Sequence, residues 1–382
     1  MKTILILIDN FYPAFKGGGP IQSITNLILS LENEFNFCVV TSAYDLKSKE
    51  IMPGIIPNAW NNILLPQGKK ETLVWYAVRR QPGYKTFKKL LHERHPDIVY
   101  MNGIFSYNLF LIPLIAIKNS ITKPRIVICP RGMLQRGALG DKNFKKKTYL
   151  KGLKISGMID KASWQATSKE EKEDILKHFP VNNGVIISQN IPKKPVLKIN
   201  ISEKSSGEFR LIYLSLLTSK KNLYFLLQLI NGIDEKINLD IYGPVKDKEY
   251  WNKCKTLIAK MPGKVKYKGH LLPIEVQSTF EQYDASILLT KGENFGHALY
   301  ESLSVGRPII TSFFTPWNNL QNLHAGWNLD INDFEGCISI LKVIIKMSKD
   351  QYKSYCIGAY DLSNSYFNSL DVQKSYGMLF SV

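Results

Sequence analysis

The chain has 382 residues, of which 45% are hydrophobic, and it carries a formal net charge of +18. This length suits two domains better than one core, and the hydrophobic content argues against a largely disordered chain. The five cysteines lack C-x-x-C spacing, which argues against a zinc site or a disulfide framework, so we expect inert core thiols.

The positive charge is concentrated in the first half of the chain. Residues 1–195 hold 29 Lys and Arg against 14 Asp and Glu, a net charge of +15, whereas residues 196–382 hold 21 against 18. This bias indicates an anionic partner, either a membrane surface with lipid-phosphate acceptors or a nucleic acid; an ordinary soluble basic surface is the alternative. The first apolar run stops at Asp9, and the segment 109–117 is much shorter than the ~20 residues that a spanning helix needs. We therefore expect a cytoplasmic protein.

A first buried strand is predicted at residues 3–8 and a helix at about 21–31. Gly17, Gly18 and Gly19 lie between them. Consecutive glycines before a helix allow backbone N–H groups to approach an oxyanion, which makes this loop a candidate binding site. The run lacks the G-x-G-x-x-G pattern, so a flexible turn is the alternative.

Two polar residues follow later strands of this half. Strands are predicted at 37–41, 97–102 and 125–129, with a basic helix at 84–93; Asn102 ends the second strand and Arg131 follows the third. The carboxyl ends of parallel strands border the ligand crevice in open α/β sheets. A guanidinium stays charged and only donates, so Arg131 would hold a phosphate or a hydroxyl group. An ion-paired structural arginine is an equally weighted alternative.

A basic segment comes next. Its cationic residues are Arg136, Lys142, Lys145, Lys146, Lys147, Lys151 and Lys154, interleaved with Phe144, Tyr149 and Leu153. This pattern fits an interfacial helix on anionic headgroups, and it also fits an ordinary exposed helix. The S/T-x-x-E pattern at Ser168 predicts the start of another helix. We place the first domain at 1–192 and a polar linker at 193–208.

The second domain is predicted at 209–365, with strands near 210–214, 239–242, 285–290 and 308–312. A final helix at 366–382 would pack back on the first domain. The alternation of strands and helices predicts an α/β protein. The central feature of this domain is a turn and helix, about 296–305, between its last two strands.

Two carboxylates flank the start of this helix. Glu293 lies in the preceding loop and Glu301 more than one turn inside the helix. The N–H groups of Phe295, Gly296 and His297 lie between them, where the positive end of a helix dipole favours a phosphate. Both carboxylates could accept hydrogen bonds from ribose or sugar hydroxyls. The pattern suits a nucleotide diphosphate sugar, although either Glu alone could be a solvated helix charge.

The motif E-N-F-G-H-x-x-x-E, followed by S-x-G-x-P-I-I-x-S and T-P-W-N-N-L, resembles the donor-site signature of family 4 retaining glycosyltransferases. The resemblance implies a GT-B fold, with two Rossmann-like domains facing a central cleft. It also implies roles for individual residues. Glu293 would lie beside the transferred hexose, Glu301 would bind the ribose, and Gly243 would lie near the base. Gly18 and Gly19 would border the cleft, and Asn102 and Arg131 would lie on the acceptor side. Many members have a histidine in place of one of these last two residues.

Family members also carry an arginine and a lysine that neutralise the leaving diphosphate. Here Leu216 occupies the arginine position, which leaves Lys220 and Lys221, of which Lys221 is the better match. Arg131 or Arg307 could supply the second cation. Electrostatic contributions of this kind are worth about 3–4 kcal/mol each, so the loss should be costly.

The resemblance therefore implies a retaining, metal-independent hexosyltransferase without a cofactor, with Glu293, Lys221 and Arg131 as its catalytic residues and a UDP-sugar as the expected donor. The acceptor would be lipid-linked or a saccharide, in the synthesis of bacterial O-antigen, capsule or related polysaccharide. We expect peripheral association with the inner face of the membrane and no nucleic-acid partner. Two alternatives stay open: a non-catalytic basic binding homologue, favoured by Leu216, and a sugar-nucleotide epimerase.

Overall fold

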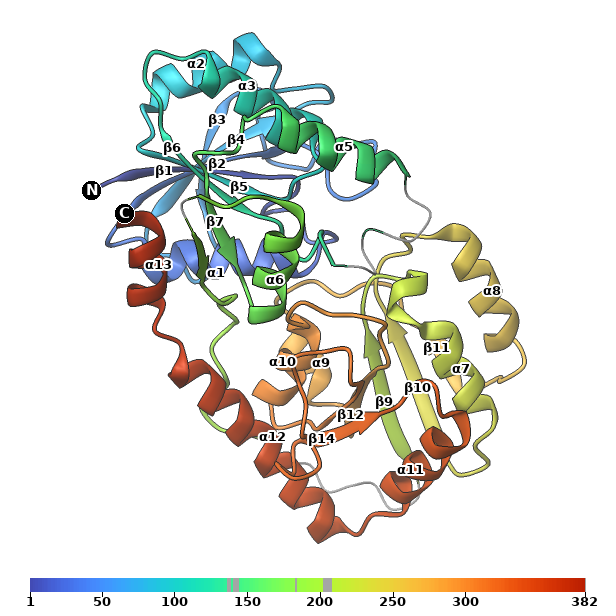
Figure 1. Cartoon of the computed structure of the whole chain (residues 1–382). Coiled ribbons are helices and arrows are strands. Elements are labelled where there is room, and N and C mark those ends of the chain that lie inside the picture. The colour runs from blue at the N-terminus through green and yellow to red at the C-terminus, as the bar shows by residue number, and fades with distance from the viewer. Residues whose placement is uncertain (136–138, 140–143, 183, 202–207, 382) are drawn as a thin grey trace. The chain divides into compact units, whose positions relative to one another are not determined.

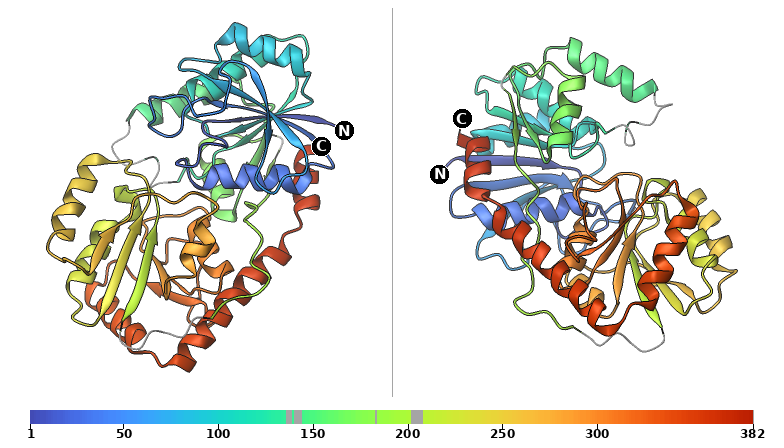
Figure 2. Two further views of the ribbon diagram at one scale, coloured as in Figure 1. Left: turned by 180° about the vertical axis from the view of Figure 1, so that it is seen from behind. Right: turned by 60° about the horizontal axis from the view of Figure 1, so that its bottom comes forward.

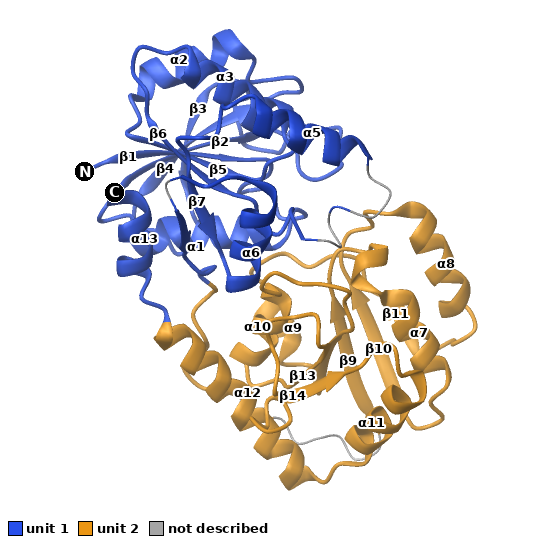
Figure 3. Cartoon of the chain, in the orientation of Figure 1, with its two compact units in different colours: residues 1–191, 370–382 blue, residues 192–369 orange. Residues whose placement is uncertain are grey.

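The structure, a computed structural model, describes residues 1–135, 139, 144–182, 184–201 and 208–381. It divides into two compact units, which Figure 3 shows in different colours. Unit 1 comprises Met1–Ile191 and Leu370–Val382, and unit 2 comprises Pro192–Ser369. Each unit is a mostly parallel sheet with helices on both faces (Figures 1 and 2). The predicted α/β class with two Rossmann-like domains is confirmed.

Unit 1 contains an eight-stranded sheet in its described residues, in the order β3-β4-β2-β1-β5-β6-β7-β8. Only the pairing of β3 with β4 is antiparallel. Its strands are β1 Thr3–Ile8, β2 Asn36–Ser42, β3 Trp60–Leu64, β4 Glu71–Ala77, β5 Ile98–Asn102, β6 Arg125–Cys129, β7 Ser163–Ala166 and β8 Val185–Ile187. Its helices are α1 Gly19–Leu31, α2 Tyr84–Arg94, the π-helix η1 Tyr107–Leu111, α3 Ile112–Lys118, α5 Phe144–Ile155, α6 Lys169–His178 and α13 Val372–Ser381.

The core of unit 1 has two layers because alternate residues of each buried strand face opposite sides of the sheet. On β1, Leu5 and Leu7 pack on the side of α2 and α3. Ile4 and Ile6 pack on the other side, where α1 and α13 lie (Figure 1). The central strands are therefore apolar throughout, and their polar residues come at the ends.

Unit 2 contains a six-stranded parallel sheet in its described residues, in the order β11-β10-β9-β12-β13-β14. Its strands are β9 Phe209–Leu214, β10 Ile237–Tyr242, β11 Val265–Tyr267, β12 Ala285–Leu288, β13 Ile309–Ser312 and β14 Gly326–Leu329. Its helices are the 3-10 helix η2 Ser219–Lys221, α7 Leu223–Asn231, α8 Lys248–Ile258, α9 Val276–Phe280, α10 His297–Ser304, α11 Phe334–Lys346 and α12 Lys349–Ser369. Because β9 and β12 are neighbours, the loops that follow them meet at one edge of the sheet.

The end of the chain differs from the sequence prediction. The helix expected at 366–382 is interrupted: residues 366–369 are the end of α12, which belongs to unit 2, and the rest of the segment contains α13, which belongs to unit 1. The break lies at Asp371, whose carboxylate accepts a hydrogen bond from the N–H of Lys374 at 2.9 Å and so starts a new helix.

The segment predicted as a linker makes specific contacts in unit 2. The N–H of Val196 donates to the carbonyl of Ser304 at 3.3 Å, and the guanidinium of Arg307 donates to the carbonyl of Asn200 at 2.9 Å. Residues 202–207 of this segment lie outside the described residues.

Candidate functional site

The loops after β9 and β12 are joined through one backbone carbonyl. The carbonyl of Lys220 accepts the N–H of Lys291 at 2.9 Å and the hydroxyl of Thr290 at 3.2 Å. Thr290 is fully buried, and its own carbonyl accepts from the hydroxyl of Ser312, on β13, at 2.6 Å. These bonds fix the two loops to each other and to the sheet.

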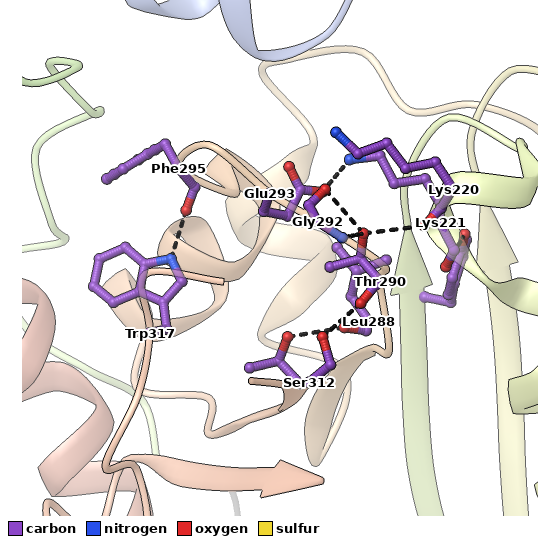
Figure 4. Close-up of polar contacts among 11 residues, drawn as sticks. Lys220, Lys221, Leu288, Thr290, Gly292, Glu293, Phe295, Ser312 and Trp317 are labelled. Atoms are coloured by element: carbon purple, nitrogen blue, oxygen red, sulfur yellow. Dashed lines mark hydrogen bonds and ion pairs between the residues drawn. The ribbon is translucent and has the colours of Figure 1, made fainter. Parts of the chain in front are cut away.

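Lys221 and Glu293, which the sequence predicts as separate ligands, form an ion pair between Nζ and Oε1 (Figure 4). Both side chains are largely covered, with 17% and 12% of their surfaces exposed. Their backbones are held independently, because the N–H of Lys221 donates to Thr218 and that of Glu293 to Phe314. The pair is therefore fixed at both ends, unlike a mobile surface salt bridge.

Lys220 lies beside this pair. Its side chain crosses close over Gly292, where an added Cβ would come within 3.3 Å of Lys220 Cε. Burial lowers the pKa of Lys220, the neighbouring Lys221 lowers it further, and Glu293 opposes the change. Two lysines and one carboxylate thus share this edge of the sheet.

The turn that leads into α10 is held by aromatic packing. The indole N–H of Trp317 donates to the carbonyl of Phe295 at 2.7 Å (Figure 4), and the Phe295 ring lies 5.4 Å from the rings of both Trp317 and Tyr366. Gly296 precedes the helix with a φ of 79°, a left-handed conformation that favours glycine. The start of α10 at His297 is therefore set by Phe295, Gly296 and the ring of Trp317.

Glu301 lies just over one turn into α10 and is 4% exposed. Its carbonyl accepts from the hydroxyl of Ser304 at 2.8 Å. Of the two predicted carboxylates, Glu301 is thus the more buried, and Glu293 pairs with Lys221.

The structure requires a glycine at position 243 for a steric reason that sequence reasoning did not identify. With φ at 135°, an added Cβ would lie 1.8 Å from the carbonyl oxygen of Ser215. The residue allows the turn after β10 to cross the loop after β9 at backbone distance. This steric role exists whether or not a base binds nearby.

The two arginines proposed to compensate for Leu216 have other partners. Arg307 is 1% exposed, and its guanidinium donates to the carbonyls of Asn200 at 2.9 Å and Glu281 at 2.8 Å. Arg131, in unit 1, donates to side chains of its own unit. Leu216 itself offers no cation.

In unit 1, the structure brings the two predicted acceptor-side residues together. Arg131 has a left-handed φ of 54°, and its Nε donates to Asn102 Oδ1 at 2.9 Å. Its Nη2 donates to the hydroxyl of Tyr100 at 2.8 Å, and its Nη1 to Asn190 Oδ1. These three partners are neutral, and three of the five guanidinium N–H groups hold the side chain in place.

A buried polar network continues from Arg131 to the last helix. The Tyr100 hydroxyl donates to Gln165 Oε1 at 2.5 Å, and Gln165 Nε2 donates to the hydroxyl of Tyr376, on α13, at 3.2 Å. Tyr376 in turn donates to the carbonyl of Gln189 at 3.0 Å. Sequence reasoning missed this network because its members lie far apart in the chain.

Glu171 is another residue whose role the sequence reveals only in part. Ser168 caps α6 as predicted, accepting the N–H of Glu171 at 3.2 Å. The buried Glu171 carboxylate accepts three hydrogen bonds, from the N–H of Gly132 at 2.6 Å and from the N–H and hydroxyl of Thr167 at 2.7 and 2.6 Å. It thereby anchors the turn that carries Arg131.

The glycine loop of unit 1 precedes α1. Gly18 has a φ of 75°, and Gly19 is the first helical residue. The loop before it is held by Asp45, whose carboxylate accepts the N–H groups of Phe15 and Lys16 at 3.2–3.4 Å. The described residues contain no cluster of three or more metal-ligating side chains.

The basic helix predicted near 145–154 is α5. Leu150 and Leu153 are buried, whereas Phe144 and Ile155 are 80% and 75% exposed at its two ends. Arg136 and Lys142 of the predicted basic segment lie outside the described residues. None of the helices in the described part of the chain combines the length and apolar character needed to cross a bilayer.

Comparisons with known proteins agree with this fold. Residues 197–319 match the family model described as glycosyl transferases group 1. Similar solved structures include HepE from Anabaena in complex with UDP and glucose (14% identity, TM-score 0.74, 100% of both chains covered). TarM from S. aureus, a mutant in complex with Fondaparinux, alpha-GlcNAc-glycerol and UDP, is 11% identical (TM-score 0.71, 100% of both chains). WaaG, a glycosyltransferase involved in lipopolysaccharide biosynthesis, is 10% identical (TM-score 0.66, 99% of this chain and 98% of WaaG).

No curated protein sequence matches the chain. The structural matches extend over both units, and the family match covers the segment that holds Lys220, Lys221, Glu293 and Glu301. The chain therefore has the GT-B fold that these glycosyltransferases share, and its residues 197–319 match the group 1 glycosyl transferases.

Proposed function

We propose that the protein is a glycosyltransferase that moves a hexose from a nucleotide diphosphate sugar, with a UDP-sugar as the preferred donor. The observation that carries this proposal is the meeting of Lys220, Lys221 and Glu293 at the carboxyl ends of β9 and β12, within the segment that matches group 1 glycosyl transferases. Solved structures of the same fold contain UDP, which supports the choice of nucleotide.

In the proposed reaction, the bond between the anomeric carbon and the diphosphate oxygen breaks while the acceptor oxygen bonds to the same face of that carbon. The configuration is therefore retained. The acceptor proton passes to a phosphate oxygen of the leaving group. Lys221, Lys220 and the amides of Phe295 to His297 take up the developing charge, without a requirement for a metal ion.

The remaining predicted residues have binding roles in this proposal. Glu293 orients the sugar, Glu301 binds the ribose, and Gly243 borders the base. In unit 1, Gly18 and Gly19 are the proposed donor-binding residues, and Asn102 and Arg131 are the proposed acceptor residues. Arg131 suits this role because Asn102, Tyr100 and Asn190 hold its guanidinium in one orientation with three of its five N–H groups, leaving two for a hydroxyl or phosphate.

We propose a lipid-linked or saccharide acceptor from the synthesis of a bacterial surface polysaccharide. Support comes from WaaG, which acts in lipopolysaccharide biosynthesis, and from α5, where lysines lie between the exposed Phe144 and Ile155. Such a helix would rest on an anionic leaflet at the cytoplasmic side of the membrane. Sedimentation with phosphatidylglycerol vesicles should be lost when Lys145, Lys147 and Lys151 are replaced by glutamine, and binding that ignores both salt and these changes would contradict the membrane role.

The donor proposal is tested by thermal stabilisation without added metal, using a panel of UDP-, GDP-, ADP- and TDP-sugars. We expect one nucleotide class to stabilise the wild type and to lose its effect in Glu301→Ala. Because Glu301 is buried, Glu301→Gln should accompany it to separate lost ligand contacts from lost packing. No stabilisation by any member of the panel would contradict the proposal.

A second candidate is a binding protein of the same fold that does not catalyse transfer. Leu216 favours it, since Arg307 is committed to backbone carbonyls and does not replace the expected cation. Slow hydrolysis of the identified donor, abolished by Lys221→Met, would exclude this candidate. Stabilisation by a donor that is never hydrolysed or transferred would support it.

A further inference from the structure

We propose that Glu293 serves as the counter-ion of Lys221 while the site is empty, and that the donor diphosphate displaces it. Glu293 then opposes the binding of a nucleoside diphosphate without its sugar, so the site prefers the intact donor to its own product. This inference rests on the proposed function.

The geometry of the pair carries the first step. Lys221 ends the 3-10 helix η2 after β9, Glu293 follows β12, and their side chains meet although their backbones are anchored separately. A change of partner therefore needs only side-chain rotation and leaves the two loops in place. Both groups are mostly covered, so neither charge is well solvated once the pair is broken.

The charges decide the second step. A diphosphate that reaches Lys221 offers it a stronger anionic partner than one carboxylate does. Glu293 is then left partly buried, next to the same phosphate, as an unpaired negative charge. Lys220, whose side chain lies close to Gly292, adds positive charge to the site.

The donor sugar resolves this conflict. A hexose has several hydroxyl groups, and each can donate a hydrogen bond to a carboxylate that has lost its lysine. The intact donor therefore satisfies Lys221 and Glu293 together, whereas the product satisfies Lys221 alone. After transfer, the return of Glu293 to Lys221 favours release of the nucleoside diphosphate.

This inference predicts that removing a residue of the proposed site strengthens the binding of one ligand. Glu293→Gln should tighten the binding of UDP about tenfold, a change that corresponds to the loss of one charge-assisted interaction. The same change should weaken the preference for the sugar nucleotide over UDP. The affinities are measured by isothermal calorimetry, with GDP, ADP and TDP as additional probes.

Two controls separate the inference from a general charge effect. Glu235→Gln removes the same charge from the ion pair with Lys346 in unit 2, on the segment that precedes β10, and should leave UDP binding unchanged. In the background of Lys221→Met, Glu293→Gln should no longer tighten binding, since its effect acts through that lysine.

The outcomes are distinct. Tightening by Glu293→Gln that disappears with Lys221→Met supports the inference. Unchanged or weaker UDP binding in a folded Glu293→Gln variant overturns it, as does equal tightening in both backgrounds or in Glu235→Gln. Failure of every variant and of the wild type to bind any of the four nucleoside diphosphates overturns the proposed function and this inference with it.

Discussion

The buried carboxylate of Glu171 allows a quantitative test of how the Arg131 turn is held. In Glu171→Gln, one of the two side-chain oxygens becomes an NH₂ group, which then faces either the N–H of Gly132 or the N–H and hydroxyl of Thr167. Of the three hydrogen bonds that the carboxylate accepts, we expect about two to be lost. At about 1.5 kcal/mol for each bond to a charged group, unit 1 should be destabilised by about 3 kcal/mol. The fold should survive, since domains of this kind are stable by about 5–15 kcal/mol.

This prediction needs an assay that reports on unit 1 alone, because two units need not unfold together. Hydrogen exchange at increasing urea, followed by mass spectrometry of peptides, separates the two units. Peptides that contain Gly132 should exchange faster in Glu171→Gln even without urea, while those of unit 2 should be unaffected. The matched control is Glu173→Gln, an exposed residue of the same helix. Equal urea midpoints for the two variants would refute the assigned role of Glu171.

Three further predictions concern the rest of the molecule. Gly243→Ala should destabilise unit 2 by more than about 2 kcal/mol in urea unfolding, because the added Cβ would meet the carbonyl of Ser215. The control is Gly263→Ala, where φ is 82° and no atom lies within 4 Å of the added Cβ. This control should cost only the ~1 kcal/mol of a left-handed backbone conformation. Trp317→Phe should cost about 1 kcal/mol and weaken UDP binding by loosening the turn at Phe295. Burial raises the pKa of all five cysteine thiols, and it raises the pKa of Cys38 and Cys129 to about 12. The thiols therefore stay protonated at pH 8 and should react with a thiol reagent only after the protein unfolds.

Each of these has a clear contradicting result. Equal stability of the two glycine variants would show that the backbone crossing at Gly243 relaxes easily. Unaltered UDP affinity in Trp317→Phe would separate the indole from the site. Stoichiometric labelling of the native protein at pH 8 would show that the cysteine-bearing core opens readily.

The sequence predicts the elements that depend on local patterns. Apolar runs identified β1, β6 and β13, and the residues at their ends were correctly expected to follow the strands. The S/T-x-x-E pattern placed the start of α6 at Ser168. Strands β3 and β4 were not predicted. The edge strand β3 reads W-N-N-I-L, and its polar residues obscure the apolar pattern.

Contacts between distant segments were beyond local patterns. Lys221 and Glu293 were each selected for a ligand, but no periodicity indicates that they bind each other across 72 residues. The same holds for Glu171, where the capping pattern gave the helix start and not the bond to Gly132. Such pairings depend on which strands are neighbours, and that order is set by tertiary packing.

The placement of α13 constrains how this chain is made. Unit 1 is built from two segments, and the second, residues 370–382, is translated only after all of unit 2. Until then the part of the first sheet that receives Tyr376, Leu379 and Phe380 lacks the cover of α13, and Lys2 lacks its bond to the carbonyl of Phe380. The nascent first domain therefore leaves the ribosome with an exposed apolar surface, while the second domain can finish folding. A gene fragment that ends near residue 191 would therefore produce a first unit that always lacks α13.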